Sequence, residues 1–263
     1  MIIRQRAVWW VLSAVVVAVT ATLTAGAMVS WMVQRTSAPA TKVYPAAQIR
    51  SVQLNTGSAD VQITAAKDGR ATVKQKLRWE FTQPQVTEHL DPTSGTLLVN
   101  ANCGALKFLG DSGCSVQLDI AVPSTVAVNA EIDSGSLRVT DVSGPVTAVA
   151  DSGEIDLHRV SGALDVRVGS GQISGTSLRS GKVAARADSG QVDLDFAAAP
   201  TSVTAHATSG EVQVTVPHGT TYHVDATAPS GGTSVDPALV SPSATGTITV
   251  SVTSGEADVQ YRR

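Results

Sequence analysis

Ser-Gly pairs return along this chain at nearly fixed intervals, and this repeat constrains the fold more than any other feature. The stretch DSGEIDLHRVSGALDVRVGSGQISG, which begins at Asp151, contains two successive units. Glycine suits a recurring sharp turn because it adopts positive φ angles at no steric cost. A second series of Ser-Gly pairs falls between the members of the first. The glycines of the main series lie 18 to 24 residues apart and are expected to be turn residues: Gly113, Gly135, Gly153, Gly171, Gly190, Gly210, Gly231 and Gly255.

Apolar and polar residues alternate behind each glycine, as in Leu137 and Val139 or in Ile155 and Leu157. A period of two is typical of a β-strand. Equivalent apolar residues of successive units would stack at the strand spacing and form a continuous core that no single unit can bury. We therefore predict an all-β fold, a β-solenoid of about 18–22-residue coils with two short strands each. A β-sandwich of antiparallel hairpins is the alternative.

The N-terminal residues 7–33 contain no charged side chain and exceed the roughly 20 residues that span a bilayer. Arg4 and Arg6 precede this segment, so the positive-inside rule predicts a cytoplasmic N-terminus, residues 1–6, and an extracellular body. The sequence thus indicates a single-pass protein of the cell membrane. A cleaved signal peptide is the alternative, because the small residues at 25–27 resemble a cleavage site.

The rest of the chain divides by composition. Residues 34–48 mix Pro, Ser, Thr and Ala and are expected to be a linker. Residues 49–263 are the predicted solenoid. Its first part, 49–114, keeps the repeat in degenerate form and includes bulky residues such as Trp79, which fits a cap on an exposed edge. Regular coils are expected over 115–263.

Cys103 and Cys114 are the only cysteines. An even count in an exported chain favours a disulfide, and two free thiols are the alternative. Two cysteines are too few for a typical structural zinc site, which uses four ligands.

Composition argues against several classes of function. Beyond residue 35 acidic residues outnumber basic ones, which is unlike a nucleic-acid-binding protein. A polysaccharide-cleaving β-helix enzyme would use clustered carboxylates such as Asp156, Asp193 and Asp195, but aromatic platforms for sugars are scarce. Solvated strand residues are the simpler interpretation. Calcium at the turn aspartates, or a metal at His218 and His223, is a weaker hypothesis than turn capping. We predict no catalytic residue, no metal site and no cofactor.

Two columns of polar residues form a candidate binding face. One contains Glu154, Gln172, Gln191 and Glu211, with Asp156 and Asp193 beside it; the other contains Arg167, Arg186 and His206. A flat surface with repeated charges can hold a polymer or another protein through many weak contacts. Solvated faces without a ligand are the alternative.

The chain resembles a widespread bacterial family known as membrane-anchored putative adhesins with β-strand repeats. A membrane segment, a two-cysteine entry region and coils such as DSGSLRVTDVSGPVTAVADSGEIDL carry the resemblance, which covers roughly residues 48–261. It implies a non-enzymatic binding or adhesion module whose partner is a cell-envelope polymer or a surface protein. A structural or sensory ectodomain that reports to a membrane-protein partner is the second hypothesis, and a polysaccharide-acting enzyme is the third.

Overall fold

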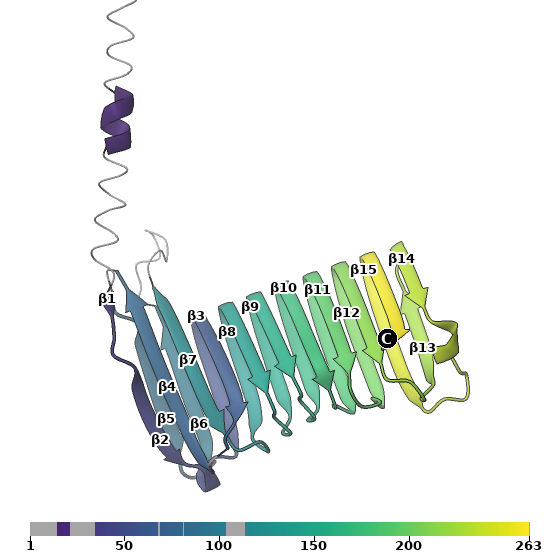
Figure 1. Ribbon diagram of the computed structural model, residues 1–263, viewed down its shortest axis with the longest axis horizontal. Helices are drawn as coiled ribbons and strands as arrows, with labels where there is room; N and C mark the ends of the chain where they lie inside the picture. The colour runs from purple at the N-terminus through teal and green to yellow at the C-terminus, as the bar shows by residue number, and fades with distance from the viewer. Residues whose placement is uncertain (1–14, 22–34, 68, 81, 104–113, 263) are drawn as a thin grey trace, which may run out of the picture.

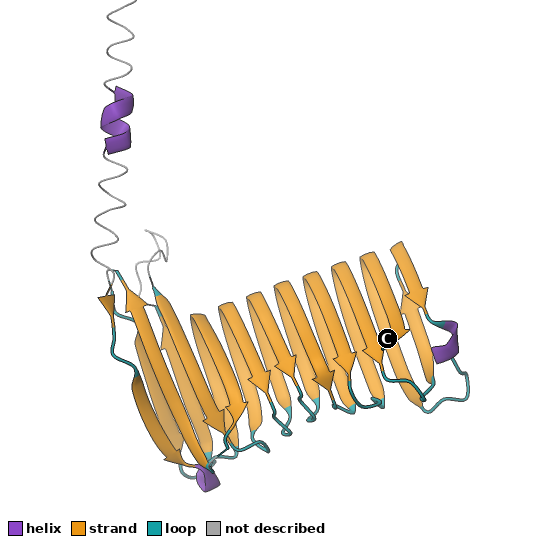
Figure 2. Ribbon diagram, viewed as in Figure 1, coloured by secondary structure: helices purple, strands orange, loops and turns teal. Residues whose placement is uncertain are grey.

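The computed structural model describes residues 15–21, 35–67, 69–80, 82–103 and 114–262. Over these residues the chain is almost entirely β, and its fifteen strands form a single hydrogen-bonded sheet that does not close. The sheet is folded lengthwise, so that the strands stand side by side like the bars of a rack (Figures 1 and 2). The all-β prediction is confirmed, and the stacked parallel strands are consistent with the predicted solenoid.

Each central coil is built on one long strand. Neighbouring long strands are parallel and in register along the ladder, so Gly153, Gly171, Gly190 and Gly210 are direct partners. Seven strands have this form: β3 (Ser51–Ala65), β8 (Ala127–Thr140), β9 (Val146–His158), β10 (Leu164–Leu178), β11 (Lys182–Phe196), β12 (Ser202–Val216) and β15 (Gly246–Tyr261).

Each long strand except β3 bends at its Ser-Gly pair, and β3 has Ser58 and Ala59 at the equivalent positions. In β10 the buried residues before the bend include Val166 and Val168, whereas the next buried residue after it is Ile173. Side chains alternate between the two faces of a strand, so buried residues at even positions before the bend and at odd positions after it show that the alternation shifts at the bend. Both halves of the strand therefore face the same core. The prediction of two short strands per coil is therefore wrong in one respect. The ladder skips only one residue at the bend, Gly169 in β10, so the halves form a single bent strand.

The expected turn glycines occupy this bend. Six of them have φ between +123° and +140°, the region that favours glycine: Gly135, Gly153, Gly171, Gly190, Gly210 and Gly255. Gly231 pairs with Gly255 without adopting a left-handed φ. Gly113 lies outside the described residues.

The core lies between the two halves of the folded sheet. Equivalent side chains stack in columns, as in Ile155, Ile173, Val192 and Val212, which have no exposed surface. Gly175 interrupts the next column. The side chain of Leu178 occupies the space above it, since a Cβ on Gly175 would lie 2.7 Å from Leu178 Cδ1.

The order of the coils departs from chain order at the C-terminal end. β15, the last strand of the chain, lies between β12 and the pair β13 (Tyr222–Thr227) and β14 (Ser230–Val235). β13 and β14 together form the outermost coil, and the short 3-10 helix η3 (Pro237–Leu239) packs beside it (Figure 1).

The N-terminal end is covered by antiparallel strands. β6 (Thr96–Asn102) and β7 (Ser115–Val122) pair with the two halves of β3 and complete one coil. β5 (Gln85–Asp91) is antiparallel to β6, and β4 (Arg70–Trp79) is antiparallel to β7.

The prediction of a linker over residues 34–48 is wrong for the part that the structure describes. β1 (Arg35–Thr36) and β2 (Ala40–Pro45) both pair with the outer edge of β4, and the 3-10 helix η1 (Ala46–Gln48) follows. Pairing with β4 satisfies the backbone groups on one side of β1 and β2 despite the loop-like composition of the segment.

Of the predicted membrane segment, residues 7–33, the structure describes 15–21, which are helical and exposed. The rest of the segment lies outside the described residues. Within the described part of the chain, no helix has both the length and the hydropathy needed to cross a membrane.

Candidate functional site

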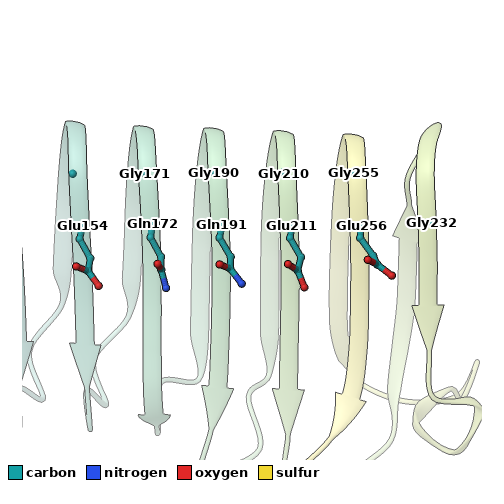
Figure 3. A pocket seen from close by; sticks show the side chains of 11 residues that line it. Glu154, Gly171, Gln172, Gly190, Gln191, Gly210, Glu211, Gly232, Gly255 and Glu256 are labelled. Atoms are coloured by element: carbon teal, nitrogen blue, oxygen red, sulfur yellow. The ribbon is translucent and has the colours of Figure 1, made fainter.

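A shallow groove of about 950 Å³ runs across the bends of successive coils. Its floor is the row of bend glycines, which leave the backbone uncovered. Directly after each glycine comes a long polar residue, and Figure 3 shows these side chains pointing the same way from adjacent strands. We call this set the corner row: Glu154, Gln172, Gln191, Glu211 and Glu256.

The register of the sheet fixes the spacing of the corner row. Glu154 pairs with Gln172, Gln172 with Gln191, Gln191 with Glu211, and Glu211 with Glu256. Each step is one strand spacing of about 4.8 Å, so five side chains present acceptor oxygens at a regular interval. Beyond Glu256 the row ends at Gly232 in β14, which has no side chain.

Asp156 and Asp193 lie on the same outer face, two residues beyond the corner row on their own strands. Asp156 accepts a hydrogen bond from Arg138 at 2.6 Å, an ion pair between neighbouring coils. Asp193 lies beside Gln213 in the ladder. The structure therefore places the four acidic residues of the predicted binding face on one outer face, as a pair on β9, Glu154 and Asp156, and a pair on β11 and β12, Asp193 and Glu211.

Repulsion between carboxylates shapes this face electrostatically. The negative charge of Asp156 raises the pKa of Glu154, with a smaller contribution from burial and a hydrogen bond to Asp156, while Arg138 opposes the shift. Burial raises the pKa of Asp193, and the charges of Asp195 and Glu211 add to the effect. A cation or a hydrogen-bond donor placed here would relieve both shifts.

The predicted basic column lies on a different face. Arg167, Arg186 and His206 are in-register partners on the half-strands before the bend, whereas the corner row lies after it. Arg167 Nε is 3.8 Å from Asp165 Oδ1, and His206 Nδ1 is 2.7 Å from Ser251 Oγ. The basic column and the corner row therefore cannot contact one small ligand together.

The two cysteines form a disulfide with a Cα–Cα distance of 6.0 Å. Cys103 follows β6 and Cys114 precedes β7, so the bond lies where other coils carry their Ser-Gly bend. Cys103 Sγ lies 4.0 Å from the carbonyl oxygen of Ser58, at the bend of the adjacent strand β3. The disulfide thus links β6 and β7, the two strands that pair with the halves of β3.

Sequence reasoning missed Glu256 as a member of the corner row. The sequence Ser-Gly-Glu at 254–256 repeats the Ser-Gly-Glu at 209–211, and this signal could have found it. The match was obscured because β13 and β14 come between β12 and β15 along the chain, although β12 and β15 are neighbours in the sheet. Among the residues that the structure describes, there is no group of three or more His, Cys, Asp or Glu arranged to hold a metal ion.

The model of one protein family matches residues 45–262, a range that contains the strands from β3 to β15 and the whole corner row. The chain belongs to the Toastrack DUF4097 family. The family name suits a sheet whose parallel strands stand in a folded row. A search of curated proteins found none that matches this Toastrack chain.

Several solved structures are similar to the chain at low identity. A putative cell adhesion protein from Clostridium sporogenes is 10% identical and covers 87% of this chain and 100% of its own, with a TM-score of 0.34. A putative adhesin from Bacteroides fragilis is 12% identical, covering 86% and 98%, with a TM-score of 0.34. A putative lipid binding protein from Parabacteroides distasonis is 12% identical, covering 86% and 97%, with a TM-score of 0.32. None of these three is named for a reaction.

Proposed function

We propose that this protein is a non-enzymatic binding module that holds an extended ligand along the corner row. One observation carries the proposal: five long polar side chains from five coils line one groove in strict register. A groove that crosses many strands fits a ligand with its own repeat better than a compact small molecule. Many weak, equally spaced contacts can add up to firm retention.

The chemistry of the corner row favours a ligand with repeated hydrogen-bond donors or positive charges. Carboxylates only accept hydrogen bonds when ionised, whereas glutamine amides both donate and accept. Glu154 and Asp193 have raised pKa values because neighbouring carboxylates and burial disfavour their charge. Donors of the ligand would replace this repulsion with attraction, so we expect its amino or hydroxyl groups to face the row.

We further propose that residues 7–33 anchor the module in the cell membrane with the rack outside. The uncharged length of the segment supports an anchor, and its residues 15–21 are helical. The disulfide between Cys103 and Cys114 supports an oxidising compartment, because such bonds are rare in the cytosol. The ligand would then be a polymer or a surface protein of the cell envelope.

Retention of separated cell-envelope fractions tests the proposal. The full chain, held in detergent micelles, is immobilised and presented with wall, anionic polymer, lipid and membrane-protein fractions. Saturable retention of one fraction is expected. The triple variant E154A/Q172A/E211A should weaken that retention by more than about tenfold, because it removes three of the five side chains of the row.

The double variant R167A/R186A is the matched control. It alters two adjacent coils on the other outer face, so retention should be unchanged if the corner row carries binding. Thermal unfolding of both variants checks that the rack stays folded. The proposal fails if no fraction is retained saturably, or if the triple variant retains it as well as the unaltered chain does.

A further inference from the structure

The C-terminal end of the rack has a free strand edge. β14 pairs with β15 along one side, and no strand of the described residues pairs with its other side. Figure 1 shows β14 as the outermost strand. Its outward N–H and C=O groups therefore lack a strand partner, which makes this edge a template for another strand.

β14 lacks the features that normally protect an edge. Its sequence, SGGTSV, contains no charged residue and no proline, and five of its six residues are exposed. Native edge strands usually carry lysine, proline or a bulge that prevents pairing with other chains. β13, in the other half of the same coil, is partly covered, because Val240 forms a parallel bridge with Tyr222 and Ser241 N donates to Tyr222 O at 2.9 Å.

The edges at the N-terminal end are protected. β2 forms most of the outer edge of one half of the sheet and carries Lys42 and Pro45. β5 forms the edge of the other half and carries Glu88, His89 and Asp91. Unlike β14, these edges contain the charges and the proline that oppose strand addition.

We propose that β14 pairs with β14 of a second copy of this chain, antiparallel about a two-fold axis. An edge strand is complementary to its own copy across a two-fold axis. The two-fold rotation reverses the strand direction, so the N–H groups of one copy face the C=O groups of the other. The uncharged sequence lets the two edges meet without like charges facing each other. The protected N-terminal edges of a second copy match β14 less well, so the mate is another β14.

Six residues form a short ladder, so the association is weak, reversible and dependent on protein concentration. The inference does not rest on the proposed ligand. It has one consequence for the corner row, which ends at Gly232 within β14. Pairing at this edge would place two grooves in one assembly and double the number of sites for a repeating ligand.

Sedimentation of the full chain in detergent micelles, over about 1–200 µM protein, tests the pairing. A reversible monomer–dimer equilibrium is expected. The proposed register has Thr233 on the two-fold axis, opposite Thr233 of the second copy. T233K should therefore raise the dimer dissociation constant at least about fivefold, because two lysines would face each other there. T233E should do the same. An equimolar mixture of T233K and T233E should restore the dimer, since the opposite charges then attract.

The control T87K alters an exposed residue of β5 at the opposite end of the rack and should leave the equilibrium unchanged. The mixture separates a true interface from a folding defect, because a misfolded chain would not be rescued by its partner. The proposal is overturned by a monomer over the whole range, by a dimer that T233K and T233E leave intact, or by failure of the mixture to restore it.

Discussion

Gly190 lies directly against Gly171 of the preceding coil: a Cβ on Gly190 would lie 1.7 Å from the carbonyl oxygen of Gly171. Gly190 also has φ of +139°, which a side chain strongly disfavours. Two independent requirements, the backbone conformation and the close approach between coils, thus select glycine at this bend. Both requirements also hold at Gly135, Gly153, Gly171, Gly210 and Gly255, which explains why glycine recurs at these bends.

We expect G190A to destabilise the protein by about 3 kcal/mol or more, because backbone strain and overlap with the adjacent coil add together. Denaturant unfolding followed by circular dichroism measures the loss. G181A is the control: a Cβ there has its nearest neighbour at 3.6 Å, and φ is not left-handed. Comparable losses in G190A and G181A would contradict the explanation.

A left-handed residue near the end of β10 leads to the opposite prediction. Ser177 has a φ of +54°, and its equivalents in the two preceding coils, Asp141 and Arg159, have φ of +61° and +52°. Glycine adopts this conformation more readily, so S177G should stabilise the protein by about 0.5–1 kcal/mol. S174G changes the same residue type within the extended part of β10 and should destabilise by about 0.5–1 kcal/mol. Unfolding free energies of equal sign for the two variants would refute this reasoning.

The stacked part of the fold could be predicted from the sequence because each coil repeats the same local signals. Glycine spacing located the bends, and alternation gave the inward residues, such as Ile155 and Val192, which are fully buried. The two ends could not be predicted in this way. The position of β15 between β12 and the outermost coil depends on long-range pairing. The local sequence of Gly246–Tyr261 does not specify which strands lie on its two sides.

The candidate site was predictable only where chain order and spatial order agree. Glu154 and Glu211 belong to the run of coils from β9 to β12, which stack in chain order, and the column containing them was found from spacing alone. Glu256 was missed because 45 residues separate it from its partner Glu211. The separation of the basic column from the corner row depends on the bend, which reverses the face that alternate residues present.

The disulfide provides a prediction about the irregular coil. Breaking it in C103S/C114S should lower the unfolding free energy by about 2–3 kcal/mol, since a loop with sequence separation 11 is no longer closed in the unfolded chain. A reductant should lower the thermal midpoint of the unaltered protein to about the midpoint of C103S/C114S. It should not change the midpoint of C103S/C114S, and an equal effect on both proteins would show that the reductant acts elsewhere.

The last prediction concerns Glu154, whose pKa is raised mainly by the charge of Asp156. Substituting D156N should lower the pKa of Glu154 toward its usual range, because the repulsion is removed. Substituting R138A should raise it further, because Arg138 opposes the shift. Carbon-13 NMR of the side-chain carboxyl, followed through a pH titration, measures both changes. Shifts in the same direction for D156N and R138A would contradict the electrostatic explanation.

A raised pKa also fixes the sign of the effect on stability. Below the usual pKa of glutamate, Glu154 is protonated in both the folded and the unfolded chain, and its ionisation does not bear on folding. As pH rises above that value, the unfolded chain loses the proton first, so the folded state is progressively disfavoured. E154Q cannot ionise. Its stability relative to the unaltered protein should therefore increase as pH rises through the folded pKa and then level off, and a decrease over that range would rule out the assigned shift.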